Sequence, residues 1–275
     1  MTTKILLTGA TGFVGRQVLI ALQAKDVDLT LIIRPGSEQK IHNDILRSKV
    51  IFSEDLFAES VKWWEKTCQN IDIVVHLAWF LKPGEYLYSD KNMICYKGSV
   101  NIAKGAAKSG VRRLVSIGTC FEYKVSSNAL TVNSALEPMT PYAEAKVKLY
   151  KKLSSLLSTF KIEFAWCRLF YLYGEFEDKR RFVPYLRSQL EHCKTAELSS
   201  GKQIRDFMDV KVAGQSIADI TLSNENGAVN VCSEIPISIR EFAEMIADEY
   251  GRRDLLNFGA RPDNKYDPPY IVGKK

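Results

Sequence analysis

The segment Lys4–Gln17 reads KILLTGATGFVGRQ, and the fold expected for the whole chain starts from it. Ile5, Leu6 and Leu7 form a short apolar run of the kind that makes a buried parallel strand. From Phe13 onward, apolar residues line one side of an expected helix. A strand that turns so quickly into a helix aims the first free N–H groups of the helix at one point, and the helix dipole favours negative charge there.

Three glycines shape the turn in this segment. Gly9 permits a tight turn, Gly12 lets a pyrophosphate approach the backbone, and Gly15 lets the helix pack against the strand. An ordinary glycine-rich corner is the alternative interpretation, since short motifs recur by chance. Because the strand–turn–helix context is correct, the segment predicts a dinucleotide site. The residues of this turn that are expected to contact the cofactor are Gly9, Thr11, Gly12, Phe13, Val14, Gly15 and Arg16.

The composition is that of a globular protein with one large domain, or one domain and a smaller companion. Of the 275 residues, 46% are hydrophobic and 25% are charged, so a sizeable core can form. No apolar run approaches the length of a membrane span, and the amino terminus enters the first strand directly. We therefore expect no membrane segment, no signal peptide and a cytoplasmic location.

Charge and cysteine usage narrow the class of partner. The net charge of +6 comes from dispersed basic residues, which fits a phosphate-bearing small ligand better than a nucleic acid. The six cysteines show no C-x-x-C spacing and no companion histidine cluster. Reduced thiols explain them better than disulfides, and no metal site is expected.

The end of the second expected strand, Asp28–Ile33, bears on the choice of cofactor. In dinucleotide enzymes an acidic residue here selects the free ribose hydroxyl, whereas a nearby arginine accommodates a ribose phosphate. The residue in this chain is Arg34, whose planar guanidinium suits a phosphate monoester. Arg16, a cation in the first turn of a helix, also suggests a nearby anion. The pair predicts a preference for NADP(H), with NAD(H) as the other cofactor to consider; two solvated arginines are the alternative.

Strands and helices alternate along the chain, which is typical of a parallel sheet with right-handed crossovers. Beyond the second strand, elements are expected at Val50–Phe52, around Trp63, at Ile71–Leu77, Tyr88–Ser109, Arg113–Ile117, Phe182–Leu190, Ala196–Leu198, Val210–Leu222, Ala228–Val231 and Ser238–Tyr250. His76 lies in an apolar strand, so it is expected to be packed rather than catalytic.

The stretch PYAEAK places Tyr142 and Lys146 on one face of a helix that begins at Thr140 and Pro141. A tyrosine that gives a proton to a carbonyl oxygen has a reference pKa of ~10, which is high for exchange near neutrality. A lysine one turn away would stabilise the phenolate and lower that pKa. The Y-x-x-x-K spacing alone is common, but the strand before it ends at Thr119, which offers a hydroxyl.

Three motifs together resemble the extended branch of the short-chain dehydrogenase/reductase superfamily, which contains nucleotide-sugar epimerases, dehydratases and reductases. They are T-G-x-x-G-x-x-G at Thr8–Gly15, the set Thr119, Tyr142 and Lys146, and GKQIRDFMDV at Gly201–Val210. The resemblance implies an α/β fold, a Rossmann-type doubly wound parallel sheet with a small interleaved substrate domain on the C-terminal side. It places the dinucleotide-binding domain at 1–169 and 209–231, and the substrate-binding domain at 170–208 and 232–275.

The resemblance also implies roles for particular residues. Tyr142 would protonate the substrate oxygen, Lys146 would bind the nicotinamide ribose, and Thr119 would orient the carbonyl. Further cofactor contacts are implied at Asp55, Leu56, Leu77 and Ala78, and substrate contacts at Thr119, Cys120, Tyr171, Arg205 and Arg261. For Arg205, which matches a diphosphate-binding arginine, an ion pair with Asp206 or Asp209 is the alternative.

Departures from the family pattern limit the reaction. Cys120 and Phe121 stand where the dehydratases carry an Asp-Glu pair, and neither can act as that acid and base. This argues against 4,6-dehydration of a sugar. Cys95 replaces the usual Asn of the long helix, and Tyr171 replaces a phosphate-contacting Asn.

From these features we expect an NADPH-dependent reductase whose partner is a nucleotide diphosphate sugar, a 4-keto-6-deoxysugar reduced at carbon 4. A nucleotide-sugar 4-epimerase with tightly bound NAD is one alternative, and a non-catalytic dinucleotide-sensing protein is another. The expected helices Tyr88–Ser109 and Pro141–Leu157 resemble those that pair in dimers of the family, so a homodimer is expected.

Overall fold

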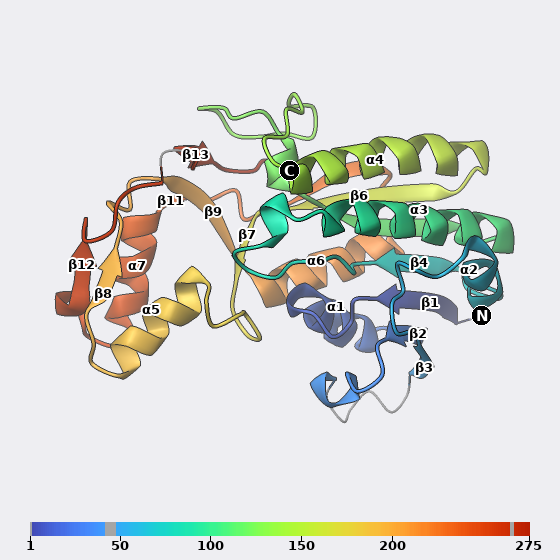
Figure 1. The fold of residues 1–275 in the computed structure, drawn as a ribbon, viewed down its shortest axis with the longest axis horizontal. Coiled ribbons are helices and arrows are strands. Elements are labelled where there is room, and N and C mark those ends of the chain that lie inside the picture. The colour runs from blue at the N-terminus through green and yellow to red at the C-terminus, as the bar shows by residue number, and fades with distance from the viewer. Residues whose placement is uncertain (1, 42–47, 265–266) are drawn as a thin grey trace.

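The structure, a computed structural model, describes residues 2–41, 48–264 and 267–275. The chain forms a large lobe around a central sheet and a smaller lobe at one end of it, on the left in Figure 1. Among the described residues, no helix is long and apolar enough to cross a membrane.

The large lobe contains seven parallel strands in the order β10-β6-β5-β4-β1-β2-β3. The strands are β1 (Thr3–Thr8), β2 (Val27–Ile33), β3 (Lys49–Phe52), β4 (Ile73–His76), β5 (Arg113–Thr119), β6 (Glu163–Leu169) and β10 (Gly227–Val231). The helices that connect them are α1 (Phe13–Gln23), α2 (Val61–Thr67), α3 (Lys91–Ser109), α4 (Pro141–Thr159) and α6 (Val210–Leu222). This strand order, with helices on both faces, confirms the expected Rossmann-type doubly wound fold.

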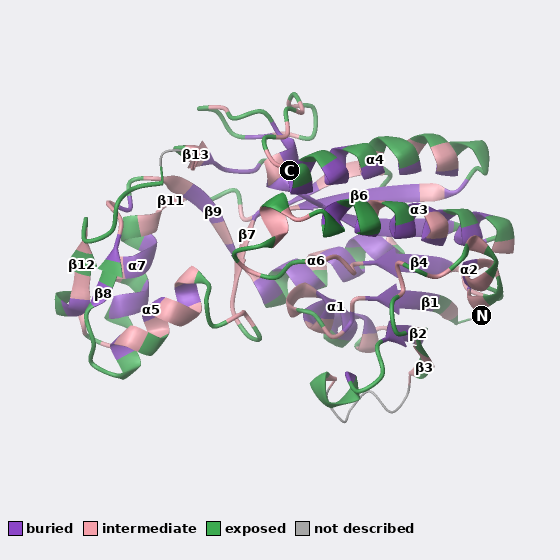
Figure 2. Cartoon of the chain, viewed as in Figure 1, coloured by how far each residue is buried: buried purple, intermediate pink, exposed green. Residues whose placement is uncertain are grey.

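Alternating side chains decide which helices cover each face of the sheet. Ile5 and Leu7 of β1 pack in one cluster with residues of α1 and α6, whereas Leu6 packs with residues of α2, α3 and α4. Successive residues of a strand point to opposite faces, so a strand covered on both sides must be apolar throughout. Figure 2 shows the result, with the central strands buried and the outer sides of α3 and α4 exposed.

Several boundaries differ from the sequence prediction by one or more residues, and two of these differences bear on the site. Helix α3 begins at Lys91 rather than at Tyr88, because a 3-10 turn, η3 (Tyr86–Tyr88), precedes it. The Asn92 side chain donates to the carbonyls of Tyr86 and Ser89, at 2.6 and 2.9 Å, and thereby fixes that turn. Strand β5 continues to Thr119 rather than ending at Ile117, pairing with β6 over its whole length. The catalytic candidate Thr119 is therefore the last residue of a buried strand.

The smaller lobe has its own apolar core between α5 (Phe182–Glu191) and α7 (Ile239–Asp248). Strands β8 (Ala196–Leu198) and β12 (Leu256–Phe258) pair with each other, and β9 (Ile204–Asp209) pairs with β7 (Tyr171–Tyr173), β11 (Pro236–Ser238) and β13 (Tyr270–Ile271). The chain returns to the large lobe through α6 and β10. We therefore propose the division into 1–169 with 209–231 and 170–208 with 232–275.

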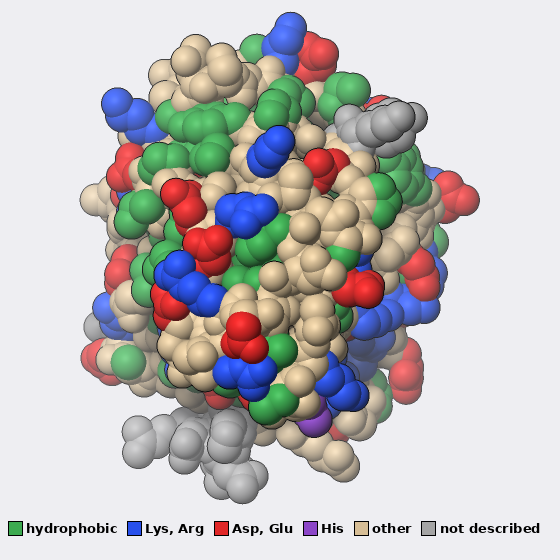
Figure 3. Space-filling view, turned by 90° about the vertical axis from the view of Figure 1, so that its left-hand side faces the viewer, with side chains coloured by type: hydrophobic (Ala, Val, Ile, Leu, Met, Phe, Trp, Pro, Cys, Tyr) green, Lys and Arg blue, Asp and Glu red, His purple; other side chains and the backbone are tan. Residues whose placement is uncertain are grey.

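The end of the molecule that carries the smaller lobe is seen in Figure 3. Lysine and arginine side chains alternate there with aspartate and glutamate side chains. Such a mixed surface exerts little net attraction on a charged ligand, because neighbouring fields of opposite sign cancel. Recognition of a charged ligand then falls to the groups inside the cavity described below.

The turn between β1 and α1 makes a prediction about stability. A Cβ atom at Gly15 would overlap the Gly9 carbonyl oxygen, whereas one at Gly12 would lie 3.3 Å from the same oxygen. Gly15→Ala should therefore lower the free energy of unfolding by about 3 kcal/mol, the upper range for overpacking, and Gly12→Ala by about 1 kcal/mol. Urea unfolding of the two variants measures this, and equal losses would contradict the packing described.

Candidate active site

A cavity of about 1160 Å³ opens where the central strands end, between the large lobe and the loop that leads into α5. It follows the carboxyl ends of the strands, where doubly wound sheets bind their ligands. The cavity is lined by most of the residues predicted to contact cofactor or substrate: Gly9, Thr11, Gly12, Phe13, Val14, Gly15, Arg34, Asp55, Leu56, Leu77, Ala78, Thr119, Cys120, Tyr142, Lys146 and Tyr171. One continuous space thus joins the predicted cofactor turn to the predicted catalytic residues.

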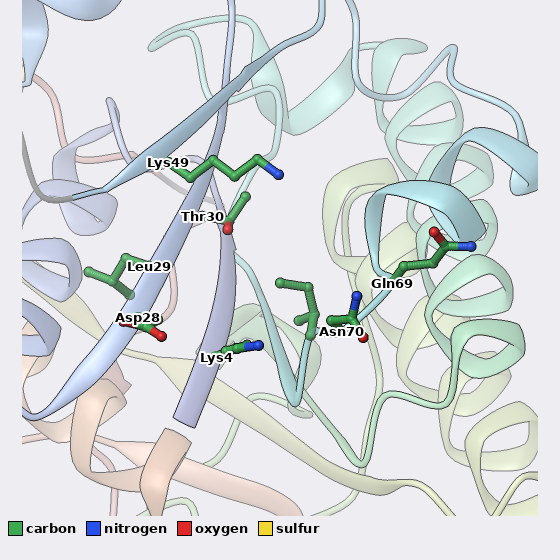
Figure 4. A pocket seen from close by; sticks show the side chains of 8 residues that line it. Lys4, Asp28, Leu29, Thr30, Lys49, Gln69 and Asn70 are labelled. Atoms are coloured by element: carbon green, nitrogen blue, oxygen red, sulfur yellow. The ribbon is translucent and has the colours of Figure 1, made fainter. Parts of the chain in front are cut away.

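A smaller hollow of about 360 Å³ lies at the opposite end of the sheet (Figure 4). Lys4, Asp28 and Lys49 line it near the starts of β1, β2 and β3. The hollow is an open depression between exposed side chains, and it has none of the predicted site residues. The larger cavity is therefore the candidate active site.

The amino terminus of α1 fits a phosphate group. Gly12 is the N-cap, no side chain caps the helix, and the first turn carries no acidic residue. The free amide groups of the first turn therefore face the cavity without a side-chain acceptor. Gly9 adopts a φ of 79°, and a Cβ atom there would lie 2.7 Å from the Ala78 amide nitrogen. Only glycine satisfies both conditions at that point.

One end of the cavity, where the sequence predicts the adenosine of a dinucleotide, is formed by residues that follow β2 and β3. Arg34 comes directly after β2, and Asp55 and Leu56 follow β3. The Asp55 carboxylate accepts a hydrogen bond from the Phe57 amide at 3.0 Å, which holds the loop in place. Within the described part of the chain, the Arg34 side chain makes no ion pair, so it can meet an anion that enters the cavity.

The catalytic candidates meet where β5 ends and α4 begins. The Thr140 hydroxyl accepts the Ala143 amide at 3.2 Å and caps α4, which has Pro141 at its start, as the sequence predicts. This places Tyr142 in the first turn of α4 and Lys146 one turn later, both buried and both lining the cavity. Thr119 faces them from the end of β5.

Lys146 is held by the protein rather than by Tyr142. Its ammonium group donates a hydrogen bond to the Ile117 carbonyl at 2.8 Å and lies 3.7 Å from the centre of the Trp79 ring. The Tyr142 ring centre is 5.9 Å away. Burial lowers the pKa of Lys146 to about 7, although Glu122 and Cys95 oppose this change. The lysine is therefore close to losing its proton near neutrality.

The pKa of Tyr142 moves in the direction opposite to the sequence prediction. Burial raises it above its ordinary value, and only a hydrogen bond with Thr119 acts to lower it. The expectation that Lys146 lowers this pKa is wrong for the structure as it stands, because the ammonium group is bonded to Ile117 and stacked on Trp79. Tyr142 is thus a protonated phenol, the form that a proton donor needs.

Three predicted residues do not line the cavity. The Arg16 guanidinium packs 4.2 Å from the centre of the Phe176 ring and donates to the Thr11 carbonyl at 3.3 Å. Arg205 is 1% exposed and pairs with Asp267 at 2.7 Å, so its ion-pair partner is neither Asp206 nor Asp209. The prediction of direct ligand contact from these side chains is therefore not met by the geometry.

Arg261, the third of these residues, is exposed and lies away from the catalytic candidates. Its guanidinium donates to the Tyr185 hydroxyl at 3.1 Å. Among the described residues of the smaller lobe, the cation that does line the cavity is Arg181, at the start of α5, which lies 4.0 Å from the Glu177 carboxylate. Burial raises the pKa of Glu177 to about 7, so this pairing is loose. Sequence reasoning missed Arg181, whose only signal was its place before an amphipathic helix.

An aromatic wall, also missed, closes the cavity beside Tyr142. Trp79 and Tyr86 contact the Tyr142 ring edge-on, with ring centres 6.4 and 5.0 Å away. The Asn92 amide holds both: its oxygen accepts from the Trp79 indole at 2.9 Å, and its nitrogen donates to the Tyr86 carbonyl. Cys95, one turn further along α3, lines the cavity, where the family has an Asn.

His76 is a core residue, as the sequence predicts. Its ring nitrogens bond to the hydroxyls of Thr8 at 2.7 Å and Ser99 at 2.8 Å, and it is 3% exposed. Burial, followed by the nearby Lys146 charge, lowers its pKa to about 3, so the ring is neutral. Among the residues that the structure describes, no group of three or more His, Cys, Asp or Glu could hold a metal ion.

Comparison with known proteins gives three findings. A family model described as "NAD dependent epimerase/dehydratase family" matches residues 5–231. The dTDP-6-deoxy-L-talose 4-dehydrogenase (NAD(+)) of Aggregatibacter actinomycetemcomitans is 26% identical over 274 residues, which cover 99% of this chain and 100% of that protein. The CDP-abequose synthase of Salmonella muenchen is 24% identical over 268 residues, which cover 94% of this chain and 84% of that protein.

A solved structure shows the same fold. The UDP-N-acetylglucosamine 4-epimerase of Methanobrevibacter ruminantium M1, in complex with UDP-N-acetylmuramic acid, matches with a TM-score of 0.89 at 21% identity. The match covers 100% of this chain and 90% of that chain. The likeness therefore extends over both lobes of the fold.

The buried Lys146 predicts a stability that depends on pH. The unfolded chain holds this proton up to its ordinary pKa of 10.5, whereas the folded protein releases it near 7. Between these values the unfolded state binds more protons, so the free energy of unfolding rises with pH. Lys146→Met removes this dependence. The free energy of unfolding of the variant minus that of the wild type should therefore fall by about 1 kcal/mol per pH unit from pH 7.5 to 9.5.

Urea unfolding across that pH range measures the difference between the two proteins. The control is Lys148→Met, which removes an exposed lysine from the same helix and should leave the difference from wild type flat with pH. A flat difference for Lys146→Met as well would show that the ammonium group is not desolvated.

Proposed function

Because the chain belongs to the NAD dependent epimerase/dehydratase family, in the extended branch of the short-chain dehydrogenases/reductases, we propose that it reduces a nucleotide-linked 4-keto-6-deoxysugar with NADPH. The enzyme modifies a nucleotide sugar, and the reduction of a ketone at sugar carbon 4 is the proposed step. The names of two relatives support it, since one is a 6-deoxysugar 4-dehydrogenase and the other an abequose synthase.

The observation that carries the proposal is the set formed by Thr119, Tyr142 and Lys146 in one cavity with the glycine turn. A proton donor, a hydroxyl that can orient an oxygen, and a buried cation converge there. The α1 amino terminus can bind the pyrophosphate of a dinucleotide, because its amide groups lack a capping side chain. The same cavity can therefore hold a cofactor and a carbonyl substrate against each other.

The reaction needs one hydride and one proton. When bound there, a reduced nicotinamide supplies the hydride to the carbonyl carbon. Tyr142 donates its phenolic proton to the carbonyl oxygen, which becomes the new hydroxyl group. The Thr119 hydroxyl orients that oxygen, and its hydrogen bond to Tyr142 favours the phenolate that remains until a solvent proton replaces the one given up. The buried, neutral phenol suits the donor role. It keeps its proton until hydride addition makes the neighbouring carbonyl oxygen basic enough to accept it.

The surroundings of the site disfavour sugar dehydration. The thiol of Cys120 is buried, and burial raises its pKa to about 12, so it stays protonated. Phe121 has no ionisable group. The positions that follow Thr119 thus hold no acid and base pair to remove a proton and expel a hydroxyl group.

For the substrate diphosphate we propose Arg181 rather than Arg205. Arg181 lines the cavity with an exposed guanidinium, 46% of its side chain being accessible, and its one ion pair is long. Arg205 is buried behind the Tyr171 ring, 5.1 Å from the ring centre, and is neutralised by Asp267. A half-exposed arginine can form paired hydrogen bonds to phosphate oxygens without first breaking a buried ion pair.

We also propose a cytoplasmic homodimer that pairs through α3 and α4. These helices lie side by side on one face of the sheet, and their outer sides are uncovered in the single chain (Figure 1). Met93 and Ile94, at 39% and 52% exposed, add apolar surface at the start of α3. A two-fold pair of such helices would bury these side chains.

The proposed reaction predicts a strict stoichiometry. Purified protein should carry no stoichiometric NAD, and NADPH absorbance should fall in proportion to added dTDP-, CDP- or GDP-linked 4-keto-6-deoxyhexose. Tyr142→Phe should fold and bind NADPH but lose turnover by ~100-fold or more, the usual share of general acid catalysis. Conversion of a 4-hydroxy nucleotide sugar into its epimer, without loss of NADPH, would make the protein an epimerase instead.

The choice of cofactor predicts a separate result for Arg34. If this guanidinium binds the ribose phosphate, Arg34→Ala should weaken NADPH binding by ~1.5–3 kcal/mol, the usual worth of a hydrogen bond to a charged group, and leave NADH binding almost unchanged. Titration calorimetry with both cofactors measures this. Because one relative is named for NAD(+), the wild type must be titrated as well. Equal losses for both cofactors would remove Arg34 from the phosphate site.

A further inference from the structure

Glu122 is a buried carboxylate that the proposed reaction does not use, and it contacts the backbone of the catalytic candidate Thr119. Glu122 is 0% exposed, and its two oxygens accept four hydrogen bonds. The donors are the Thr119 amide at 2.8 Å, the Trp166 indole at 3.0 and 3.1 Å, and the Arg168 guanidinium at 2.7 Å. Burial raises the pKa of Glu122, whereas the Arg168 charge and the hydrogen bonds from Arg168, the Thr119 amide and the Trp166 indole act to lower it. Because all three groups around the two oxygens are N–H donors and one of them is a guanidinium, we assign Glu122 as a carboxylate.

The backbone and the neighbouring side chains leave space for this carboxylate. A Cβ atom at Gly118 would overlap both a Glu122 oxygen and the Trp166 indole nitrogen, so the strand must have glycine there. Arg168, also buried, donates to the Tyr123 hydroxyl at 3.1 Å and stacks on the Tyr123 ring at 4.7 Å. The Tyr123 hydroxyl in turn donates to Asn230 at 2.6 Å. The carboxylate therefore sits in a rigid, fully bonded network.

This network ends on a catalytic candidate. The amide that Glu122 holds belongs to Thr119, the last residue of β5, whose hydroxyl faces Tyr142 in the cavity. Without that acceptor the Thr119 amide would be a buried donor with no partner. The negative charge of Glu122 also acts on Tyr142 and on Lys146, for both of which it favours the protonated form.

We propose that Glu122, paired with Arg168, is a positioning residue that fixes Thr119 beside Tyr142 and whose carboxylate favours the protonated forms of Tyr142 and Lys146. The inference rests on the proposed function, since it assigns a role relative to these catalytic residues. Stability alone is a weak reason for such a pair, because buried ion pairs can often be replaced by apolar residues without loss. A role in catalysis would explain why a buried ion pair stands at this position.

Several groups besides Glu122 face the two catalytic side chains, Tyr142 and Lys146. Tyr86 and Cys120 face Tyr142 and disfavour its phenolate, as Glu122 does, while Thr119 favours it. Cys95 faces Lys146 from α3, and His76 lies close to the same ammonium group from β4. Of these groups, we assign Glu122 alone as an anion, held by the Arg168 cation and by the N–H groups of Thr119 and Trp166. Removing it should therefore make both Tyr142 and Lys146 lose protons at lower pH.

The test is the pH profile of kcat/KM for the keto sugar at saturating NADPH. In Glu122→Gln, which keeps an oxygen for the Thr119 amide but removes the charge, the basic limb should move to lower pH by about one unit. A shift of one pH unit corresponds to about 1.4 kcal/mol, the order of magnitude expected for a partly screened interaction with one unit charge. The double variant Glu122→Gln/Arg168→Gln leaves no unpaired buried charge. Because it also removes the opposing Arg168 charge, it should move the basic limb in the same direction by a smaller amount, which tests the role even if the single variant does not fold.

The matched control is Glu163→Gln, which removes the carboxylate 3.1 Å from buried Arg113 at the other end of β5 and β6. It should lower stability and leave the pH profile unmoved. A basic limb that stays in place in the folded Glu122 variants would overturn the positioning role. If Tyr142→Phe also kept full activity, the proposed function itself would fail; if Tyr142→Phe were inactive, only the role of Glu122 would be lost.

Discussion

The Lys146 ammonium group, which is buried and donates a hydrogen bond to a backbone carbonyl, is the constraint on which the site depends. Its partners are the Ile117 carbonyl at 2.8 Å and the face of the Trp79 ring at 3.7 Å. An ammonium group out of water is costly, so the elements that meet it must be held firmly. Strand β5, helix α4 and the loop after β4 all meet at this point, and Asn92 fixes that loop to α3. The geometry around Tyr142 is therefore set before any ligand arrives.

The division of the chain into two lobes separates binding from chemistry. The large lobe supplies the glycine turn, the uncapped helix start and the catalytic residues, all at the carboxyl ends of parallel strands. The smaller lobe supplies the opposite wall, with Arg181 in front and Tyr171 backed by the Arg205–Asp267 ion pair. Asp206, beside Arg205, accepts the amides of Ser233, Glu234 and Gly273 and so ties the last strand to this wall. A ligand that spans the cavity must contact both lobes.

Local patterns in the sequence were enough to predict the parallel sheet and to propose a site, whose predicted residues Thr119, Tyr142 and Lys146 line one cavity. The smaller lobe was expected only from the family resemblance. The apolar strand, the glycine turn and the four-residue spacing of Tyr142 and Lys146 each depend on neighbours a few residues away, which periodicity reports directly. What escaped prediction depends on pairs that are distant in the sequence. Glu122 and Arg168 are 46 residues apart, and the partner of Arg205 proved to be Asp267, at the far end of the chain. No local pattern specifies such pairs, because only the packing of the sheet and the lobes brings them together.

The most direct test of the account is to follow the hydride itself. NADPH carrying deuterium at the transferable position of nicotinamide carbon 4 would be supplied with a nucleotide-linked 4-keto-6-deoxysugar, and the product examined by NMR and mass spectrometry. A reductase that works through Tyr142 and an exchangeable cofactor must place one deuterium on sugar carbon 4 for each NADPH consumed. A sugar product that carries no deuterium from the added cofactor would contradict the account.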